Sequence, residues 1–259
     1  MTTVPGGHEI RIFRDHTALM EAAAEDVAQC FVACRTGGRV ALAGGRTPVT
    51  LYERLSAPTS PIKVDVSRIR FTLTDERAVP PDHEDSNYGL AYRTFFEPLK
   101  VPVENVLRFH GEKPIERATA KAHRELLVWA QRVPLFDLVI LGLGADGHVA
   151  SLFPAPEWPD FGARLVASTV DPHGRPRITL TPEALRSSRR TMFLVSGASK
   201  APAVRDTLTA DAPSPSRPAR MVGGGKAPVV WFLDRAAASL LPDSLRQESG
   251  AESRETTTF

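Results

Sequence analysis

An apolar run from Phe136 to Leu143 limits the possible folds of this 259-residue chain more than any other segment. Asp137 is the only charged residue in the run. A transmembrane helix needs about 20 apolar residues, so a run this short is not a membrane span. Its continuous apolar character predicts a central strand that is covered on both faces.

Segments with strand and helix patterns alternate along the rest of the chain. Such alternation predicts an α/β fold, with a mainly parallel sheet and helices on both faces. The other expected strands are 39–43, 69–74, 164–169, 177–180, 192–196 and 229–233. The expected helices are 17–35, 86–96, 116–131, 198–208 and 234–240, with one more that begins at Pro48.

The same pattern predicts a single α/β domain over residues 1–241. Residues 210–225 are rich in Pro, Ser, Arg and Gly, so we expect a mobile surface loop there. Residues 242–259 are polar and lack periodicity, which predicts a disordered C-terminal tail.

Composition argues against several kinds of partner. With 32 Lys and Arg against 30 Asp and Glu, the net charge of +2 lacks the basic excess of nucleic-acid-binding proteins. Neither a membrane span nor a signal peptide is apparent, so we expect a cytoplasmic protein with no membrane partner. Cys30 and Cys34 lie four residues apart on one expected helix, with no zinc set around them. We therefore expect no metal and no nucleic acid.

Four segments of unusual composition follow expected strands, where the ligands of open α/β sheets bind. The first is Gly44 to Pro48 (GGRTP). Thr47 is a natural N-cap and Pro48 suits the first helical position, so a helix N-terminus follows the glycines directly. That arrangement suits a phosphate, although the glycines would equally serve a tight turn.

The second segment, after the expected strand 69–74, carries Asp75 and Arg77. Charged residues directly after an apolar strand are costly unless they face solvent or a polar cleft. An aspartate there can hold a hydroxyl, and an arginine can bind a phosphate with two parallel hydrogen bonds. For Asp85 and Ser86, farther along, a solvated loop with a helix cap is the better interpretation.

The third segment, Gly142 to Pro154, reads GLGADGHVASLFP. Its start matches G-x-G-x-x-G, the phosphate-binding pattern of dinucleotide folds, which requires a helix from the third glycine. Prolines from position 154 onward interrupt any such helix, so we reject a dinucleotide site. The turn instead presents Asp146 and His148 together. Histidine is a common proton acceptor near neutral pH, and a nearby carboxylate would orient its ring.

The fourth segment, Ser196 to Ala201 (SGASKA), again lies between an apolar strand and a helix. Lys200 falls in the first helical turn, where its charge opposes the helix dipole. A bound anion would relieve that conflict, and an exposed lysine is the simpler alternative.

Taken together, the four segments resemble the 6-phosphogluconolactonases of the glucosamine-6-phosphate isomerase/6-phosphogluconolactonase family. The resemblance covers about residues 9–240, and the motifs occur in the family's order. They are Ala43 to Pro48, Asp75 to Arg77, His83 with Asp85 to Asn87, Gly144 to Pro154, and Lys200. The chain departs from the family at Ala43, where Ser is usual, and at Val149, where Thr is usual. We expect these departures to weaken substrate binding at most.

This resemblance implies the fold shared with glucosamine-6-phosphate deaminases and ribose-5-phosphate isomerase-type proteins. It also implies a catalytic domain that needs no metal, nucleotide or other cofactor. The implied reaction is hydrolysis of 6-phospho-D-glucono-1,5-lactone, a small sugar-phosphate lactone, to 6-phospho-D-gluconate. We expect a monomer or a small homo-oligomer.

The resemblance also suggests roles for individual residues. We expect His148 to act as the general base on a water molecule that attacks the lactone, with Asp146 beside it. Asp75 would bind a sugar hydroxyl or orient the lactone. The expected phosphate-binding residues are Gly44, Gly45, Arg77 and Lys200, with Arg46 as a weaker candidate.

Two other functions stay open on the sequence. A glucosamine-6-phosphate deaminase of the same fold would use a similar aspartate and Asp-x-His pair, and Glu157 could supply the glutamate that it also needs. A non-catalytic sugar-phosphate sensor normally carries an added DNA-binding or partner-binding module. No such module is apparent in the sequence, and the presence of both Asp146 and His148 favours catalysis.

Overall fold

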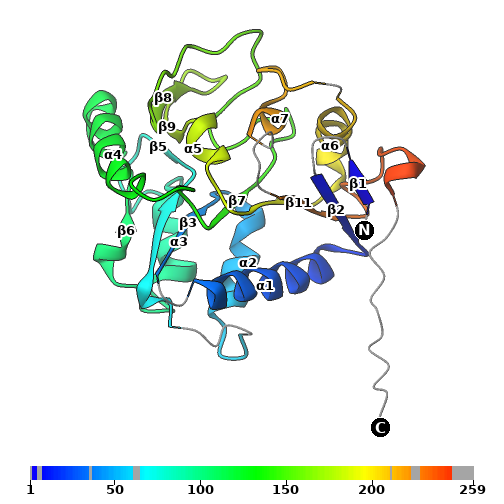
Figure 1. Ribbon diagram of the computed structural model, residues 1–259, viewed down its shortest axis with the longest axis horizontal. Coiled ribbons are helices and arrows are strands. Elements are labelled where there is room, and N and C mark those ends of the chain that lie inside the picture. The colour runs from blue at the N-terminus through cyan, green and yellow to red at the C-terminus, as the bar shows by residue number, and fades with distance from the viewer. Residues whose placement is uncertain are drawn as a thin grey trace.

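The computed structural model describes residues 2–4, 8–34, 37–60, 65–210, 212–222 and 228–246. Within these ranges an eight-stranded sheet crosses the molecule in the order β1-β2-β11-β10-β7-β3-β4-β6 (Figure 1). Its neighbouring strands are parallel except for β1 and β2. The strands are β1 Thr2–Val4, β2 His8–Phe13, β3 Gly38–Leu42, β4 Ile69–Leu73, β6 Val106–Leu107, β7 Leu138–Leu141, β10 Thr191–Val195 and β11 Val229–Asp234.

The apolar run that we identified in the sequence forms β7, which lies between β10 and β3. Its side chains enter two different cores. Leu138 and Ile140 pack on one face of the sheet, and Val139 and Leu141 pack on the other. Burial on both faces explains why the run lacks the polar alternation of a half-exposed strand. The predicted α/β fold with a mainly parallel sheet is confirmed.

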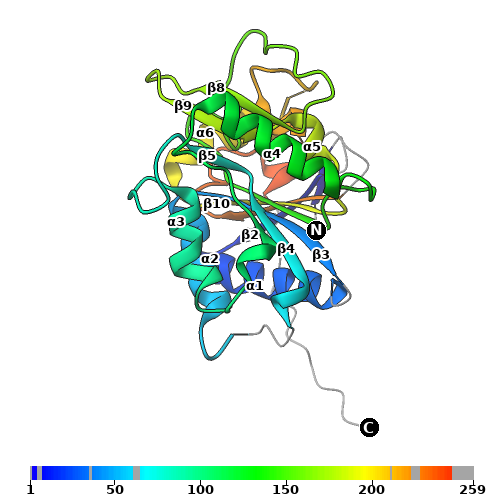
Figure 2. The same ribbon diagram turned by 90° about the vertical axis from the view of Figure 1, so that its left-hand side faces the viewer.

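Helices cover both faces of this sheet (Figure 2). Helices α1, α2 and α3 lie on one face, and α4, α5, α6 and α7 lie on the other. The helices are α1 His16–Ala33, α2 Arg46–Ser56, α3 Asn87–Ala91, α4 Ile115–Trp129, α5 Pro182–Arg186, α6 Ala201–Leu208 and α7 Pro218–Val222. A π-helical turn, Tyr92–Phe96, continues α3. Among the described helices, none is long and apolar enough to cross a membrane.

A second sheet contains three antiparallel strands, β5 (Asp75–Arg77), β9 (Pro176–Leu180) and β8 (Val166–Val170). The expected strands 164–169 and 177–180 therefore do not join the parallel sheet. The chain passes from one sheet to the other at Thr74, whose N–H donates to the Leu42 carbonyl at 2.9 Å while its own carbonyl accepts from Leu180 N at 2.8 Å. Asp75 consequently lies on a strand, close to the end of β4.

Two helix predictions need correction. Helix α2 begins at Arg46, and its N-cap is Gly45 instead of the expected Thr47. Gly45 has a φ of +88°, in the left-handed region that glycine enters without steric cost, so the chain turns into the helix there. The expected helix 234–240 is a series of turns, and the Asp234 carboxylate accepts a hydrogen bond from Ala237 N at 2.7 Å.

The segment 210–225, which we expected to be a mobile loop, contains the short helix α7. This helix buries Pro218, Ala219 and Val222. Two of these side chains belong to the larger hydrophobic core, so residues 218–222 pack against the body of the protein. In the expected tail, Asp243–Leu245 form a 3-10 turn. Positions 211, 223–225 and 247–259 lie outside the described residues.

Candidate active site

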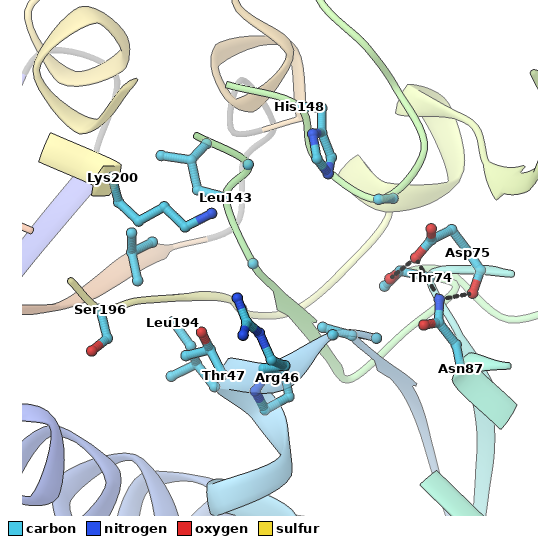
Figure 3. Close-up of a pocket in the computed structure, with 18 of the residues that line it drawn as sticks. Arg46, Thr47, Thr74, Asp75, Asn87, Leu143, His148, Leu194, Ser196 and Lys200 are labelled. Atoms are coloured by element: carbon cyan, nitrogen blue, oxygen red, sulfur yellow. Dashed lines mark hydrogen bonds between the residues drawn. The ribbon is translucent and has the colours of Figure 1, made fainter. Parts of the chain in front are cut away.

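A cavity of about 170 Å³ lies at the carboxyl ends of β3, β4, β7 and β10. All four segments that we singled out in the sequence contribute to its wall. Figure 3 shows His148, Lys200 and Arg46 pointing toward one open space, with Asp75 and Asn87 on the side away from Lys200. The expected site residues that line the cavity are Gly44, Gly45, Arg46, Asp75, Arg77, His148 and Lys200.

Asp146, the remaining expected residue, contacts the ring of His148 from beside the cavity. Its Oδ1 atom lies 2.6 Å from His148 Nδ1 and accepts the backbone N–H of His148 at 3.2 Å. Because an ionised carboxylate only accepts hydrogen bonds, Nδ1 carries the hydrogen of this contact, and in the neutral form of the ring Nε2 has a free lone pair. Partial burial raises the pKa of Asp146, but the hydrogen bonds and charge of His148 outweigh burial and bring it below its usual value.

Glycine at position 144 makes this pair possible. A Cβ atom on Gly144 would lie 2.2 Å from His148 Nδ1 and 2.3 Å from Asp146 Oδ1, too close for either side chain to keep its place. Gly147, between the two, has a φ of +89°. Two of the three glycines that resemble a dinucleotide pattern, Gly144 and Gly147, therefore serve the Asp146–His148 contact.

Asp75 forms the opposite wall and is almost completely buried. Its Oδ2 atom accepts the Ser151 hydroxyl at 2.6 Å. Asn87 Nδ2 donates to the backbone carbonyl of Asp75 at 2.9 Å and to its Oδ1 atom at 3.3 Å. Since Ser151 follows His148 in the same loop, this hydrogen bond joins the Asp75 wall to the loop that carries the histidine.

Asn87, which the sequence predicted only as part of the family pattern and not as a site residue, also lines the cavity. A Cβ atom on Gly44 would lie 2.1 Å from the Asn87 amide, so the absence of a side chain at Gly44 makes room for Asn87. Glu76 fixes the backbone beside it, because its buried carboxylate accepts the N–H groups of Asn87 and Tyr88, each at 2.8 Å. Burial raises the pKa of Glu76 and outweighs these hydrogen bonds. Glu76 thus holds the start of α3.

Cationic groups gather at the other end of the cavity. Lys200 and Arg46 extend into it from different elements, and Thr47 and Ser196 lie beside them (Figure 3). The pKa of Lys200 lies below its usual value. Burial is the main cause and the positive charge of Arg46 adds to it, whereas the negative charge of Asp146 acts in the opposite direction. Two cations this close, next to the N-terminus of α2, favour a bound anion.

Arg77 also lines the cavity, and its Nη1 atom donates to the Asp85 carbonyl at 2.5 Å. Arg77 also lines a second cavity of about 380 Å³, which Asp146 and His148 line as well. The described residues contain no cluster of three or more His, Cys, Asp or Glu side chains that could hold a metal ion.

The two departures from the family pattern lie in different surroundings. Ala43 lines the cavity, so a hydroxyl at this position would reach the ligand space. Val149 is fully buried in the hydrophobic core and does not line the cavity. Only the first departure can therefore affect ligand contacts directly.

Comparison with known proteins places this site in a family. The sequence profile of the glucosamine-6-phosphate isomerases/6-phosphogluconolactonase family matches residues 14–231. The chain belongs to this family. The match covers the whole three-stranded sheet, strands β3, β4, β6, β7 and β10 of the large sheet, and all four cavity segments. Most of the fold and the site described above therefore come from the same stretch of sequence.

Individual members of the family agree over nearly the whole chain. A 6-phosphogluconolactonase from Homo sapiens is 36% identical over 243 residues, covering 90% of this chain and 93% of the relative. The crystal structure of 6-phosphogluconolactonase from Thermotoga maritima superposes with a TM-score of 0.75 at 34% identity, covering 88% of this chain and 99% of that one. A monomeric glucosamine-6-phosphate deaminase shares the fold, with a TM-score of 0.78 at 21% identity, covering 90% and 99% of the two chains.

Glu157 had left a deaminase function open on the sequence. In the structure it is exposed and lines a separate surface cavity with Trp158 and Phe161. It lines neither of the two cavities that His148 borders. The acidic side chain that the alternative required is therefore outside the site.

Proposed function

We propose that this chain hydrolyses 6-phospho-D-glucono-1,5-lactone to 6-phospho-D-gluconate. The observation that carries the proposal is the arrangement of one cavity, with a carboxylate-bound histidine at one side and Lys200 and Arg46 at the other. A sugar-phosphate lactone has a reactive carbonyl carbon at C1 and a phosphate at C6. Its two ends match the two sides of the cavity, and the named activity of the 6-phosphogluconolactonase relatives supports the same assignment.

In the proposed reaction His148 acts as the general base. A water molecule attacks C1 while the free lone pair at Nε2 takes one of its protons. The tetrahedral intermediate then collapses, the bond between C1 and the ring oxygen breaks, and His148 returns the proton to that oxygen. Asp146 stabilises the transient imidazolium, since its carboxylate already binds Nδ1. The strained ester needs no covalent nucleophile, so positioning and proton transfer suffice.

The other wall residues bind and orient the lactone. Lys200 and Arg46 would hold the phosphate together with the backbone N–H groups around Gly44 and Gly45. Arg77, the remaining expected phosphate-binding residue, would add positive charge from β5, the strand that also carries Asp75. Asp75 would accept a sugar hydroxyl or orient the ring, because its carboxylate is fixed in place by Ser151 and Asn87.

We also propose the setting in which the enzyme works. Residues 1–241 would act as one catalytic domain, because both hydrophobic cores are built on the same sheet. It would act in the cytoplasm as a monomer or small homo-oligomer, on a small-molecule substrate, without a metal, a cofactor or a nucleic-acid partner.

The test follows acid release from freshly prepared 6-phosphogluconolactone, with spontaneous hydrolysis subtracted. The proposal predicts a rate well above the spontaneous one, and no ammonia from glucosamine 6-phosphate. Ammonia release without lactone hydrolysis would establish the deaminase reaction instead. If neither substrate reacts while 6-phosphogluconate still raises the melting temperature, the chain is a sugar-phosphate sensor.

A further inference from the structure

Ser196 lies on the cavity wall, but its hydroxyl group points to a buried carboxylate. Its Oγ atom lies 2.5 Å from Asp234 Oδ2 and 3.0 Å from His16 Nδ1. Because the carboxylate can only accept, the Ser196 hydroxyl donates to Asp234. The hydroxyl has one hydrogen, so it must accept at its contact with His16, and His16 Nδ1 must carry the hydrogen of that bond.

Asp234 also holds the turn that leads to Lys200. Its two carboxylate oxygens accept the Gly197 N–H at 3.1 and 3.0 Å, and Oδ1 accepts Ala237 N–H at 2.7 Å. Gly197 has a φ of +99° and begins the 3-10 turn Ala198–Lys200. The Lys200 N–H closes this turn on the Gly197 carbonyl at 3.0 Å. The carboxylate thus fixes the backbone from which Lys200 reaches into the cavity.

His16 connects this turn to the facing wall. Its Nε2 atom lies 3.3 Å from the hydroxyl oxygen of Thr50 in α2. With the ring hydrogen on Nδ1, neutral His16 accepts the Thr50 hydroxyl at Nε2. Thr50 lies one helical turn after Arg46, the second cation of the cavity, so His16 ties together the two elements that supply positive charge.

We propose that Asp234, acting through Ser196 and with His16, is the positioning group that sets Lys200 for a phosphate. Asp234 does not line the cavity, so it acts through other residues. A carboxylate near an anion site lowers affinity unless donors surround it, and four hydrogen bonds surround this one. The proposal deepens the proposed function, because it assigns the phosphate end of the same cavity.

The test measures binding of 6-phosphogluconate and of gluconate, which lacks the phosphate, by titration calorimetry on the full chain. Asp234→Asn leaves one acceptor oxygen for the three donor groups, which are the Ser196 hydroxyl and the N–H groups of Gly197 and Ala237. The new amide N–H₂ group would face donors where an acceptor stood before. We expect 6-phosphogluconate to bind about tenfold more weakly and gluconate to bind as before, since the loss of charge-assisted hydrogen bonds to the Gly197 turn leaves Lys200 less well positioned. Lys200→Ala should show the same selective loss or a larger one.

The double variant Asp234→Asn with Lys200→Ala decides between positioning and a separate contribution. If Asp234 acts through Lys200, the double variant binds 6-phosphogluconate as weakly as Lys200→Ala alone. Asp137→Asn is the matched control. The Asp137 carboxylate also accepts a backbone N–H, that of Arg39, at 3.0 Å. Asp137 directly precedes β7, so it lies at the end of that strand opposite the cavity. It should leave the ratio of the two affinities unchanged.

His16 offers a smaller test with a conservative rescue. His16→Ala should weaken 6-phosphogluconate about threefold, whereas His16→Asn, whose amide can replace the Nδ1 donor, should restore most of the affinity. If Asp234→Asn does not fold, Ser196→Ala replaces it in the double-variant comparison with Lys200→Ala. Ser196→Ala removes only one of the four hydrogen bonds to the Asp234 carboxylate.

The positioning role would be overturned if Asp234→Asn weakened the binding of 6-phosphogluconate and of gluconate equally. It would also be overturned if the losses of affinity from the two single variants multiplied in the double variant. The outcome is separable from that for the proposed function. A chain that shows this coupling but does not hydrolyse the lactone refutes the proposed reaction alone. A chain that hydrolyses the lactone without the coupling refutes the positioning role alone.

Discussion

The two aspartates of the site, Asp75 and Asp146, lie in opposite surroundings. The side chain of Asp146 is 46% exposed, and the partner of its carboxylate is His148. Asp75 is 8% exposed and is held by Ser151 and Asn87. A carboxylate with several buried donors is part of the fold, whereas a half-exposed one with a single histidine partner can respond to a proton on that histidine. We therefore expect Asp75 to matter most for stability and Asp146 for proton transfer.

Among the changes that test this contrast, the largest effect should come from disturbing the Asp146–His148 contact without substituting either residue. Gly144→Ala places a Cβ atom 2.2 Å from His148 Nδ1, so the ring must move away from Asp146. We expect kcat for the lactone to fall by about 100-fold or more, in the range of a misplaced general base. Stopped-flow acid release measures it.

Binding and melting experiments show whether this loss is local. Gly144→Ala should bind 6-phosphogluconate within about threefold of the native chain, because the phosphate end of the cavity is unchanged. Native kcat in a folded Gly144→Ala variant would mean that the contact between the two side chains does not contribute to turnover.

Asp75→Asn should act mainly on stability. The new amide N–H₂ group would face the Ser151 hydroxyl or the Asn87 amide, both of which donate, and would leave a buried donor without an acceptor. We expect the free energy of unfolding to fall by about 1–3 kcal/mol, measured by urea denaturation. The same substitution at the half-exposed Asp146 should change it by less than about 0.5 kcal/mol. Equal losses at the two sites would remove the contrast between them.

Asp146→Asn should act mainly on turnover. The substitution removes the carboxylate that accepts the Nδ1 hydrogen of His148 at 2.6 Å and that would stabilise the imidazolium formed in the proposed reaction. We expect kcat near pH 8 to fall about tenfold, as expected for a weaker base. Because the pKa of Asp146 lies below its usual value, the native carboxylate is ionised at this pH and provides this stabilisation. Native kcat in Asp146→Asn would show that the carboxylate does not assist His148.

Much of the site could be predicted because its residues follow strands that are readable in the sequence. A strand end is indicated by the apolar run that forms β7 and by the glycine turns after β3 and β10. In a parallel sheet such ends share one edge, so His148, Gly44 and Lys200 could be expected together although they are far apart in the chain.

The parts that could not be predicted depend on pairing between distant or very short segments. Strand β5 has three residues, and nothing in Asp75 to Arg77 indicates that it pairs with β9. Strand β2 was not predicted at all, since its apolar residues alternate with polar ones over only six positions. His16 and Thr50 belong to no motif, and only the packing of α1 against α2 brings them to Ser196. The reason for glycine at position 44 likewise lies in Asn87, on another element.

The role of His148 is tested most directly by comparing the native chain with His148→Ala on freshly made 6-phosphogluconolactone. We expect the native chain to accelerate acid release and His148→Ala to lower kcat by about two to four orders of magnitude. We also expect the variant to bind 6-phosphogluconate still, which would show that its cavity is intact. Near-native turnover by a folded His148→Ala variant would contradict the assignment of His148 as the general base.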